Sequence, residues 1–103
     1  MFQQHDPKQQ LRIRRFRSST AWTKLSKWKL DNNPLCFDPF KDHYKEGRVV
    51  LSKEVHHIKQ VATNWELRAS RDNLASLCTA CHSRVSRIER LGGDSIGLFP
   101  VNM

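Results

Sequence analysis

The sequence has few of the features that export or membrane insertion require. None of its apolar runs reaches about 18 residues, and the stretch from Met1 to Asp6 lacks the apolar segment of a secretory signal. Internal repeats and low-complexity tracts are also lacking. At 103 residues the chain is too short for two separate domains, so we expect one small cytoplasmic domain with a thin core.

Cysteine is scarce, and its number is odd. Cys36, Cys78 and Cys81 are the three cysteines, and two residues separate the last pair. In a chain without an export signal this spacing is typical of metal ligands rather than of disulfides. We interpret all three as reduced thiols available to a metal. A small buried thiol cluster is the alternative, because one such pair is only moderately specific.

Basic residues outnumber acidic ones, and most of the excess lies in the first 30 residues. The net charge is +8, with a pI of about 9.9, and residues 1–30 hold eight Lys or Arg against one Asp. A basic surface can simply favour solubility. A cluster of arginines instead suits pairing with phosphates, so we expect an N-terminal DNA contact. The cluster consists of Arg12, Arg14, Arg15 and Arg17.

The hydrophobic pattern predicts the order helix, knuckle, β-hairpin, loop, helix. Trp22, Leu25 and Trp28 recur at helical spacing and predict a helix over 20–32, which Asn33 and Pro34 end. Aromatic side chains at this spacing are more often core than base-stacking surfaces, so we assign the tryptophans to packing.

After this helix the sequence predicts an irregular knuckle over 35–47. The β-branched segments 48–51 and 54–58 are expected to form two arms of a hairpin or one bent extended segment. Residues 72–74 begin a short helical turn, and a helix over 79–91 ends at Gly92 and Gly93. We therefore divide the chain into a flexible basic arm (1–17), a domain (18–93) and a tail (94–103).

Four features occur in a fixed order: Cys36, the pair His56-His57, Asn73, and Cys78-x-x-Cys81-His82. Together they resemble the HNH endonuclease family, and in particular its small free-standing phage and prophage members. The resemblance runs from about Phe16 to Arg87 and begins with Phe16-x-Ser18-x-x-x-Trp22 and Asn33-Pro34-Leu35-Cys36. It implies an α+β fold with a ββα-metal core, an N-terminal basic helix and a zinc knuckle.

The histidines suit the chemistry that this resemblance implies. Phosphodiester hydrolysis needs a base near neutral pH, and the imidazole of His57 is the candidate. By resemblance, the amide oxygen of Asn73 orients this ring. His56 and His82 are the expected ligands of a catalytic Mg²⁺ or Mn²⁺, and tighter, inhibitory Zn²⁺ binding is an alternative.

Two further observations qualify this picture. Adjacent residues of a strand point to opposite faces, so His56 and His57 reach one site only where the strand ends or bulges, and two incidental histidines are the alternative. Cys81 and His82, in contrast, diverge by about 100° around a helix. One can therefore face a structural zinc site while the other faces the catalytic strands.

The zinc knuckle departs from the family's four-cysteine pattern, because Pro39 occupies the position of a second cysteine after Cys36. For the fourth ligand we consider His43 first and Asp38 second, and the third alternative is that no zinc binds. Three thiolates and one imidazole form an ordinary tetrahedral zinc site.

The sequence thus predicts an endonuclease that nicks one DNA strand per active site, as a monomer or a homodimer. Arg84 and Arg87, on the last helix, are candidate phosphate contacts or a solvated basic face. A non-catalytic zinc-knuckle module that binds DNA, or that assists genome packaging, is the alternative. By resemblance alone, a phage terminase is a candidate partner.

Overall fold

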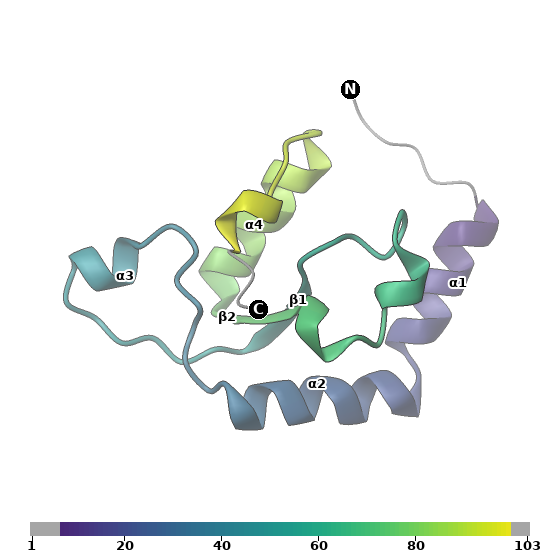
Figure 1. The fold of residues 1–103 in the computed structure, drawn as a ribbon, viewed down its shortest axis with the longest axis horizontal. Coiled ribbons are helices and arrows are strands. Elements are labelled where there is room, and N and C mark those ends of the chain that lie inside the picture. The colour runs from purple at the N-terminus through teal and green to yellow at the C-terminus, as the bar shows by residue number, and fades with distance from the viewer. Residues whose placement is uncertain (1–6, 100–103) are drawn as a thin grey trace.

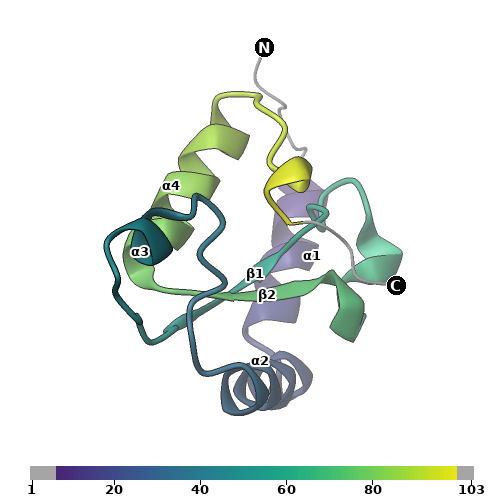
Figure 2. The ribbon, with the colours of Figure 1, turned by 60° about the vertical axis from the view of Figure 1, so that its left-hand side comes forward.

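A computed structural model describes residues 7–99 of the chain. A two-stranded antiparallel sheet lies at its centre, with α2 packed on one side and α4 on the other (Figures 1 and 2). The helices and strands are α1 (Pro7–Arg17), α2 (Thr20–Asn32), α3 (Asp42–Lys45), β1 (Glu54–His57), β2 (Leu74–Leu77) and α4 (Thr79–Arg90). Short 3₁₀ turns are η1 (Trp65–Leu67), η2 (Arg71–Asn73) and η3 (Ile96–Leu98). The predicted α+β class is confirmed.

Helix α2 has the bounds that the sequence predicts. Ser19 caps its first turn, because the Ser19 Oγ accepts a hydrogen bond of 3.1 Å from the Trp22 amide. Helix α4 also begins where expected, and Cys78 is its N-cap. Among residues 7–99, no helix is both long enough and apolar enough to span a membrane.

Of the two alternatives for 48–51 and 54–58, a hairpin or one bent extended segment, the hairpin is wrong. Strand β1 pairs instead with β2, in the register Glu54↔Leu77 to His57↔Leu74, and residues 48–51 contribute only the bridge Leu35↔Leu51. All four residues of β2 are buried, so its sequence shows no alternation of polar and apolar residues. Leu-Ala-Ser-Leu also lacks β-branched residues, which explains why the sequence did not indicate a strand there.

The predicted flexible basic arm (1–17) also differs from the structure, because residues 7–17 form α1. Tertiary contacts stabilise this helix: Phe16 packs on Trp22 and Trp65, with ring centroids 5.5 and 6.0 Å apart, and the guanidinium of Arg12 lies 4.0 Å from the Trp65 centroid. The Gln9 side chain donates a hydrogen bond to the Ala62 carbonyl. The remainder of the predicted arm, residues 1–6, lies outside the described residues.

The segment predicted as a tail folds back onto the core as far as residue 99. Phe99 is 1% exposed and Ser95 is 3% exposed, and the Phe99 ring lies 5.4 Å from that of Phe37. A single aromatic side chain beyond Gly92 and Gly93 carried no periodic signal in the sequence. The last four residues of the predicted tail, 100–103, are not among those described, and the division into arm, domain and tail stays a prediction.

We expect Phe99→Ala to lower the free energy of unfolding by about 3–5 kcal/mol, the usual cost of removing a buried phenylalanine side chain. Urea unfolding at constant zinc concentration measures the change. Ile96→Ala is the matched control, because Ile96 lies in the same segment but is 42% exposed, and its effect should stay within about 0.5 kcal/mol. Equal small effects of both substitutions would show that this segment contributes little to the fold.

Candidate active site

A cleft of about 630 Å³ runs between α1, the end of β1 and α4. Its walls bring together all three histidines that the sequence assigns to catalysis. They also include basic residues of α1 and an acidic residue of α4. The side chains that concern the chemistry are Arg14, Arg17, Trp22, His56, His57, His82, Ser86 and Glu89.

His57 ends β1 and is held in one orientation by its surroundings. Its ring is 6% exposed and stacks on the Trp22 ring, with centroids 4.8 Å apart and an interplanar angle of 22°. The His57 Nε2 lies 2.9 Å from the Arg68 carbonyl oxygen. A carbonyl only accepts hydrogen bonds, so Nε2 donates and Nδ1 carries the free lone pair of the neutral ring.

The electrostatic environment of His57 favours its neutral form. Burial lowers the pKa of His57 below its ordinary value, and the positive charge of Arg17 acts in the same direction. The hydrogen bond to the Arg68 carbonyl opposes this shift without reversing it. A neutral imidazole at neutral pH is the form that can accept a proton from water.

Asn73 occupies a different place from the one predicted, because its amide contacts the backbone rather than the His57 ring. Its Oδ1 accepts from the Lys59 amide at 2.7 Å, and its Nδ2 donates to the Lys59 and Leu67 carbonyls at 3.0 and 3.3 Å. These bonds tie together the loop that joins β1 to β2. Since that loop carries the Arg68 carbonyl, Asn73 positions His57 only indirectly.

His56 points to the other side of the sheet, toward α4. Its ring is 5% exposed and stacks on Phe99 at 5.4 Å, and its centroid lies 5.7 Å from that of His82. Burial is the main cause that lowers the pKa of His82, and the neighbouring His56 adds to it. The imidazoles of His56 on β1 and His82 on α4 thus lie next to each other in the cleft.

His56 and His57 point to opposite faces of β1, as expected for neighbours in a strand, and yet both line one cleft. The reason is that β1 lies at an edge of a two-stranded sheet and ends at His57. The cleft reaches around this end of the strand. Both rings therefore reach one site because the strand ends there, and no bulge is needed.

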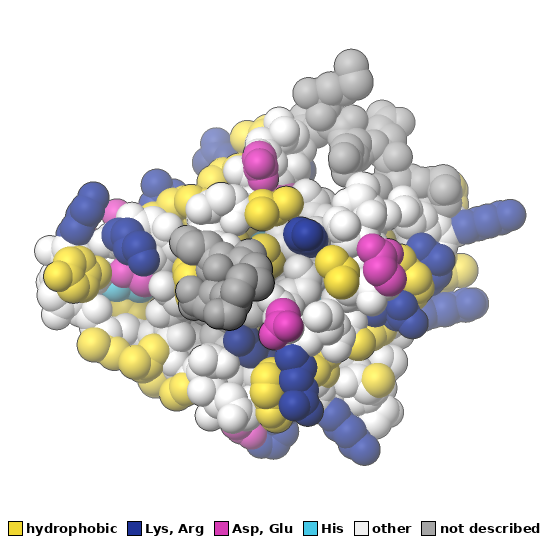
Figure 3. Space-filling view, in the orientation of Figure 1, with side chains coloured by type: hydrophobic (Ala, Val, Ile, Leu, Met, Phe, Trp, Pro, Cys, Tyr) yellow, Lys and Arg dark blue, Asp and Glu magenta, His cyan; other side chains and the backbone are white. Residues whose placement is uncertain are grey.

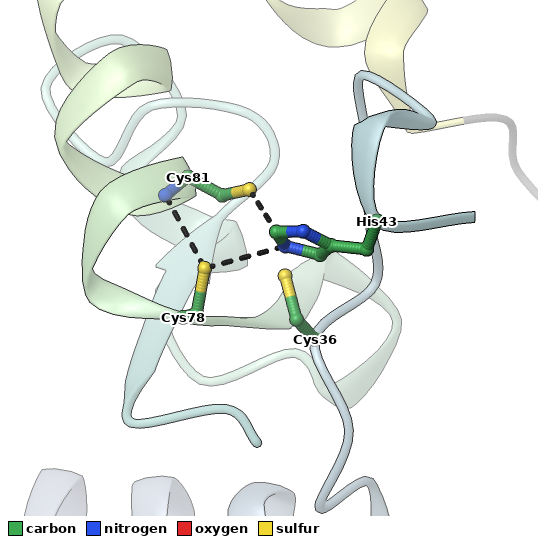
Figure 4. A group of neighbouring side chains, drawn as sticks. All are labelled: Cys36, His43, Cys78 and Cys81. Carbon is green, nitrogen blue, oxygen red and sulfur yellow. Dashed lines mark hydrogen bonds between the residues drawn. The ribbon is translucent and has the colours of Figure 1, made fainter. Parts of the chain in front are cut away.

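A second group of side chains lies at the start of α4 and will be called the thiol cluster: Cys36, His43, Cys78 and Cys81 (Figure 4). Their ligand atoms all lie within 4.8 Å of one another. The His43 Nε2 is 3.5 Å from the Cys78 Sγ and 3.4 Å from the Cys81 Sγ. A tetrahedral zinc site places sulfur and nitrogen about 3.5 Å apart, so the donor set and its spacing fit Zn²⁺.

In the absence of a cation, at least one thiol of this cluster stays protonated near neutral pH. Burial opposes ionisation of Cys78, but the Cys81 amide and the His43 ring stabilise its thiolate and lower the pKa of Cys78 to about 7. Burial and the adjacent Cys78 and Cys36 raise the pKa of Cys81 far above its ordinary value. A divalent cation would supply the positive charge that three neighbouring thiolates need.

Of the two side chains considered as the fourth zinc ligand, the structure favours His43 over Asp38. The Asp38 carboxylate accepts hydrogen bonds from the backbone amides of His43 and Tyr44, at 3.1 and 3.0 Å, and these bonds contribute to lowering the pKa of Asp38. Asp38 therefore holds the first turn of α3, whose N-cap residue is Lys41. The His43 ring of this turn points toward the thiols (Figure 4).

The predicted DNA-contacting arginines lie in four different places. Arg14 and Arg17 line the cleft, whereas Arg12 and Arg15 line a second, apolar groove between α1 and Trp65. Basic side chains project from the edge of the molecule that α1 forms (Figure 3). Arg84 pairs with Asp42 at 2.8 Å and covers the Phe40 ring, so it braces the knuckle. Arg87 is exposed and does not line the cleft.

Sequence reasoning missed Glu89, which lies in the cleft beside His56. The signal that would have found it is its position seven residues after His82, two turns further along the same helical face. The Arg68 carbonyl had no signal of this kind, because any residue supplies a carbonyl. Its role depends on the fold of the loop.

Comparisons with known proteins agree with this geometry. A search of curated proteins gives no match. The chain is similar, at 30% identity and a TM-score of 0.69, to the HNH endonuclease of the deep-sea thermophilic bacteriophage GVE2, whose crystal structure contains a manganese ion; the match covers 82% of this chain and 89% of that one. The model of the HNH endonuclease family matches residues 35–87. This match covers half of the chain, and the chain belongs to the HNH endonuclease family.

Proposed function

We propose that this protein is a metal-dependent DNA endonuclease that nicks one strand per active site, with His57 as the general base. The observation that carries the proposal is the hydrogen bond from the His57 Nε2 to the Arg68 carbonyl. It leaves Nδ1 as the basic nitrogen of a buried, neutral ring in a cleft that His56 and His82 also line. The GVE2 enzyme supports the proposal, because it is an HNH endonuclease with a manganese ion.

The residues of the cleft have different roles in hydrolysis. His57 takes the proton of the attacking water, while Trp22 stacking and the Arg68 carbonyl keep its ring in place. His56 and His82 hold Mg²⁺ or Mn²⁺, which when bound stabilises the negative charge that develops on the phosphate and the leaving oxygen. Arg14 and Arg17 attract the DNA backbone into the cleft.

The thiol cluster has a structural role in this proposal. Zn²⁺ held by three thiolates and His43 would tie the knuckle to the start of α4, which carries His82. The oligomeric state and a terminase-like partner stay predictions from the resemblance. A DNA-binding module without catalysis is the competing function, and the first experiment separates the two.

The proposed function is tested by incubating the protein with supercoiled plasmid and Mg²⁺ or Mn²⁺. We expect nicked circles to accumulate before linear DNA, and EDTA to stop the reaction. His57→Ala should lower the rate by about two to four orders of magnitude, since this is the usual range for loss of a general base, while the protein stays folded and keeps its DNA affinity. Equal, trace nicking by both proteins would favour the non-catalytic module.

The zinc site is tested by the zinc content of the purified protein and by competition with a chromogenic chelator. We expect Cys78→Ser and His43→Ala each to weaken zinc binding by more than about 100-fold, because each removes a ligand. Asp38→Asn is the control: its single side-chain oxygen can still accept from the His43 amide, only the bond from the Tyr44 amide is lost, and zinc should be retained. Full retention of zinc by His43→Ala would exclude His43 as a ligand.

The basic wall of the cleft is tested by the salt dependence of binding to duplex DNA without added divalent ion. Replacing Arg14 and Arg17 together with alanine should weaken binding and reduce the slope of log K against log salt by about 2, since each phosphate contact contributes about 0.9. Arg48→Ala is the matched control, because Arg48 pairs with Glu46 and does not line the cleft. An unchanged slope in the double variant would show that α1 does not contact phosphates.

A further inference from the structure

Helix α4 presents three polar side chains to the cleft at helical spacing. His82, Ser86 and Glu89 are separated by four and three residues, so they share one face of the helix, and all three line the cleft. Glu89 is the acidic one, and its side chain is only 13% exposed. A carboxylate so deeply placed needs a positive partner or several hydrogen bonds.

The position of Glu89 relative to His56 is unusual for a simple hydrogen bond. The Glu89 Oε2 lies 3.1 Å from the His56 Nε2, and yet this buried nitrogen has no aligned hydrogen-bond partner among the described residues. Two ligands at adjacent corners of an octahedron, each about 2.1 Å from a metal, are about 3.0 Å apart. The two atoms therefore have the separation of neighbouring ligands.

Glu89 is itself held in place by a buried residue that does not line the cleft. The buried Ser95 donates a hydrogen bond of 2.5 Å from its Oγ to the Glu89 Oε2. Phe99 stacks on the His56 ring and fixes it in the same way. Outer contacts of this kind are what orient the ligands of metal sites.

We propose that Glu89 is a third protein ligand of the divalent ion, beside His56 and His82. This inference rests on the proposed function, because it concerns the same ion. Two imidazoles and one carboxylate on one side of an ion, with positions left open, form a common catalytic arrangement. The carboxylate also brings the hard oxygen donor that Mg²⁺ and Mn²⁺ prefer and that two imidazoles alone lack.

Closing this set of ligands requires a movement of the His82 side chain. The His56 and His82 ring centroids are 5.7 Å apart, and among the described residues only the thiol cluster has three or more ligand atoms all within 4.8 Å of one another. His56 and Glu89 are fixed by Phe99 and Ser95, whereas His82 is only half-buried. The His82 ring therefore turns toward the other two ligands when the ion binds.

The test measures Mn²⁺ binding by calorimetry and by electron paramagnetic resonance, on zinc-loaded protein without DNA. Glu89→Gln keeps the size of the side chain and removes its charge. It should weaken Mn²⁺ binding by more than about 100-fold, and Ser95→Ala by about tenfold, because Ser95 only orients the carboxylate. Glu66→Gln, at an exposed position, is the matched control and should bind Mn²⁺ normally.

Comparing Mn²⁺ with Ni²⁺ separates a ligand from a residue that merely orients His56. Loss of a carboxylate ligand should weaken Mn²⁺ more than Ni²⁺, because imidazoles hold Ni²⁺ well by themselves. Equal losses for both ions, or normal Mn²⁺ binding by Glu89→Gln, would overturn the assignment. His82→Ala distinguishes this failure from that of the proposed function: if it too binds Mn²⁺ normally, the whole metal site is wrong, and if it alone binds weakly, only Glu89 is excluded.

Discussion

The contact among Cys36, His43, Cys78 and Cys81 fixes where α4 begins, and the rest of the active site depends on that point. Cys81 and His82 are neighbours, so a helix that presents one to the thiol cluster must present the other about 100° away, toward β1. The buried hydrophobic core is small and extends to Cys78 and Cys81 themselves. In such a domain, cross-linking through a metal contributes stability that apolar burial does not supply.

The features that the sequence predicted correctly are those that leave a local signal. Helix α2 shows a regular apolar spacing with a cap and a stop, and its bounds agree with the structure. Cys36, His43, Cys78 and Cys81 come together as proposed, because their residue types and spacing already described a metal site. His56, His57 and His82 line one cleft for the same reason.

The features that it missed depend on tertiary contacts. Strand β2 is buried on both faces and shows no alternation, so its pairing with β1 could not be inferred from Leu-Ala-Ser-Leu. Helix α1 is mainly polar and is held by Phe16 packing between aromatic rings. The acceptor for His57 is a backbone carbonyl rather than the Asn73 amide, and no sequence pattern specifies which carbonyl a folded loop will present.

The return of the chain after Gly92 and Gly93 supports side chains of the cleft. Ser95 and Phe99 contact Glu89 and His56, so residues beyond the last helix hold groups that lie in the cleft. A deletion from residue 94 onward would leave every histidine and cysteine in place and still expose His56 to solvent. A fusion or shortened protein that keeps only residues 35–87, which the family model matches, would therefore retain the histidines and cysteines of the two sites. It would lose the contacts that Ser95 and Phe99 make with Glu89 and His56.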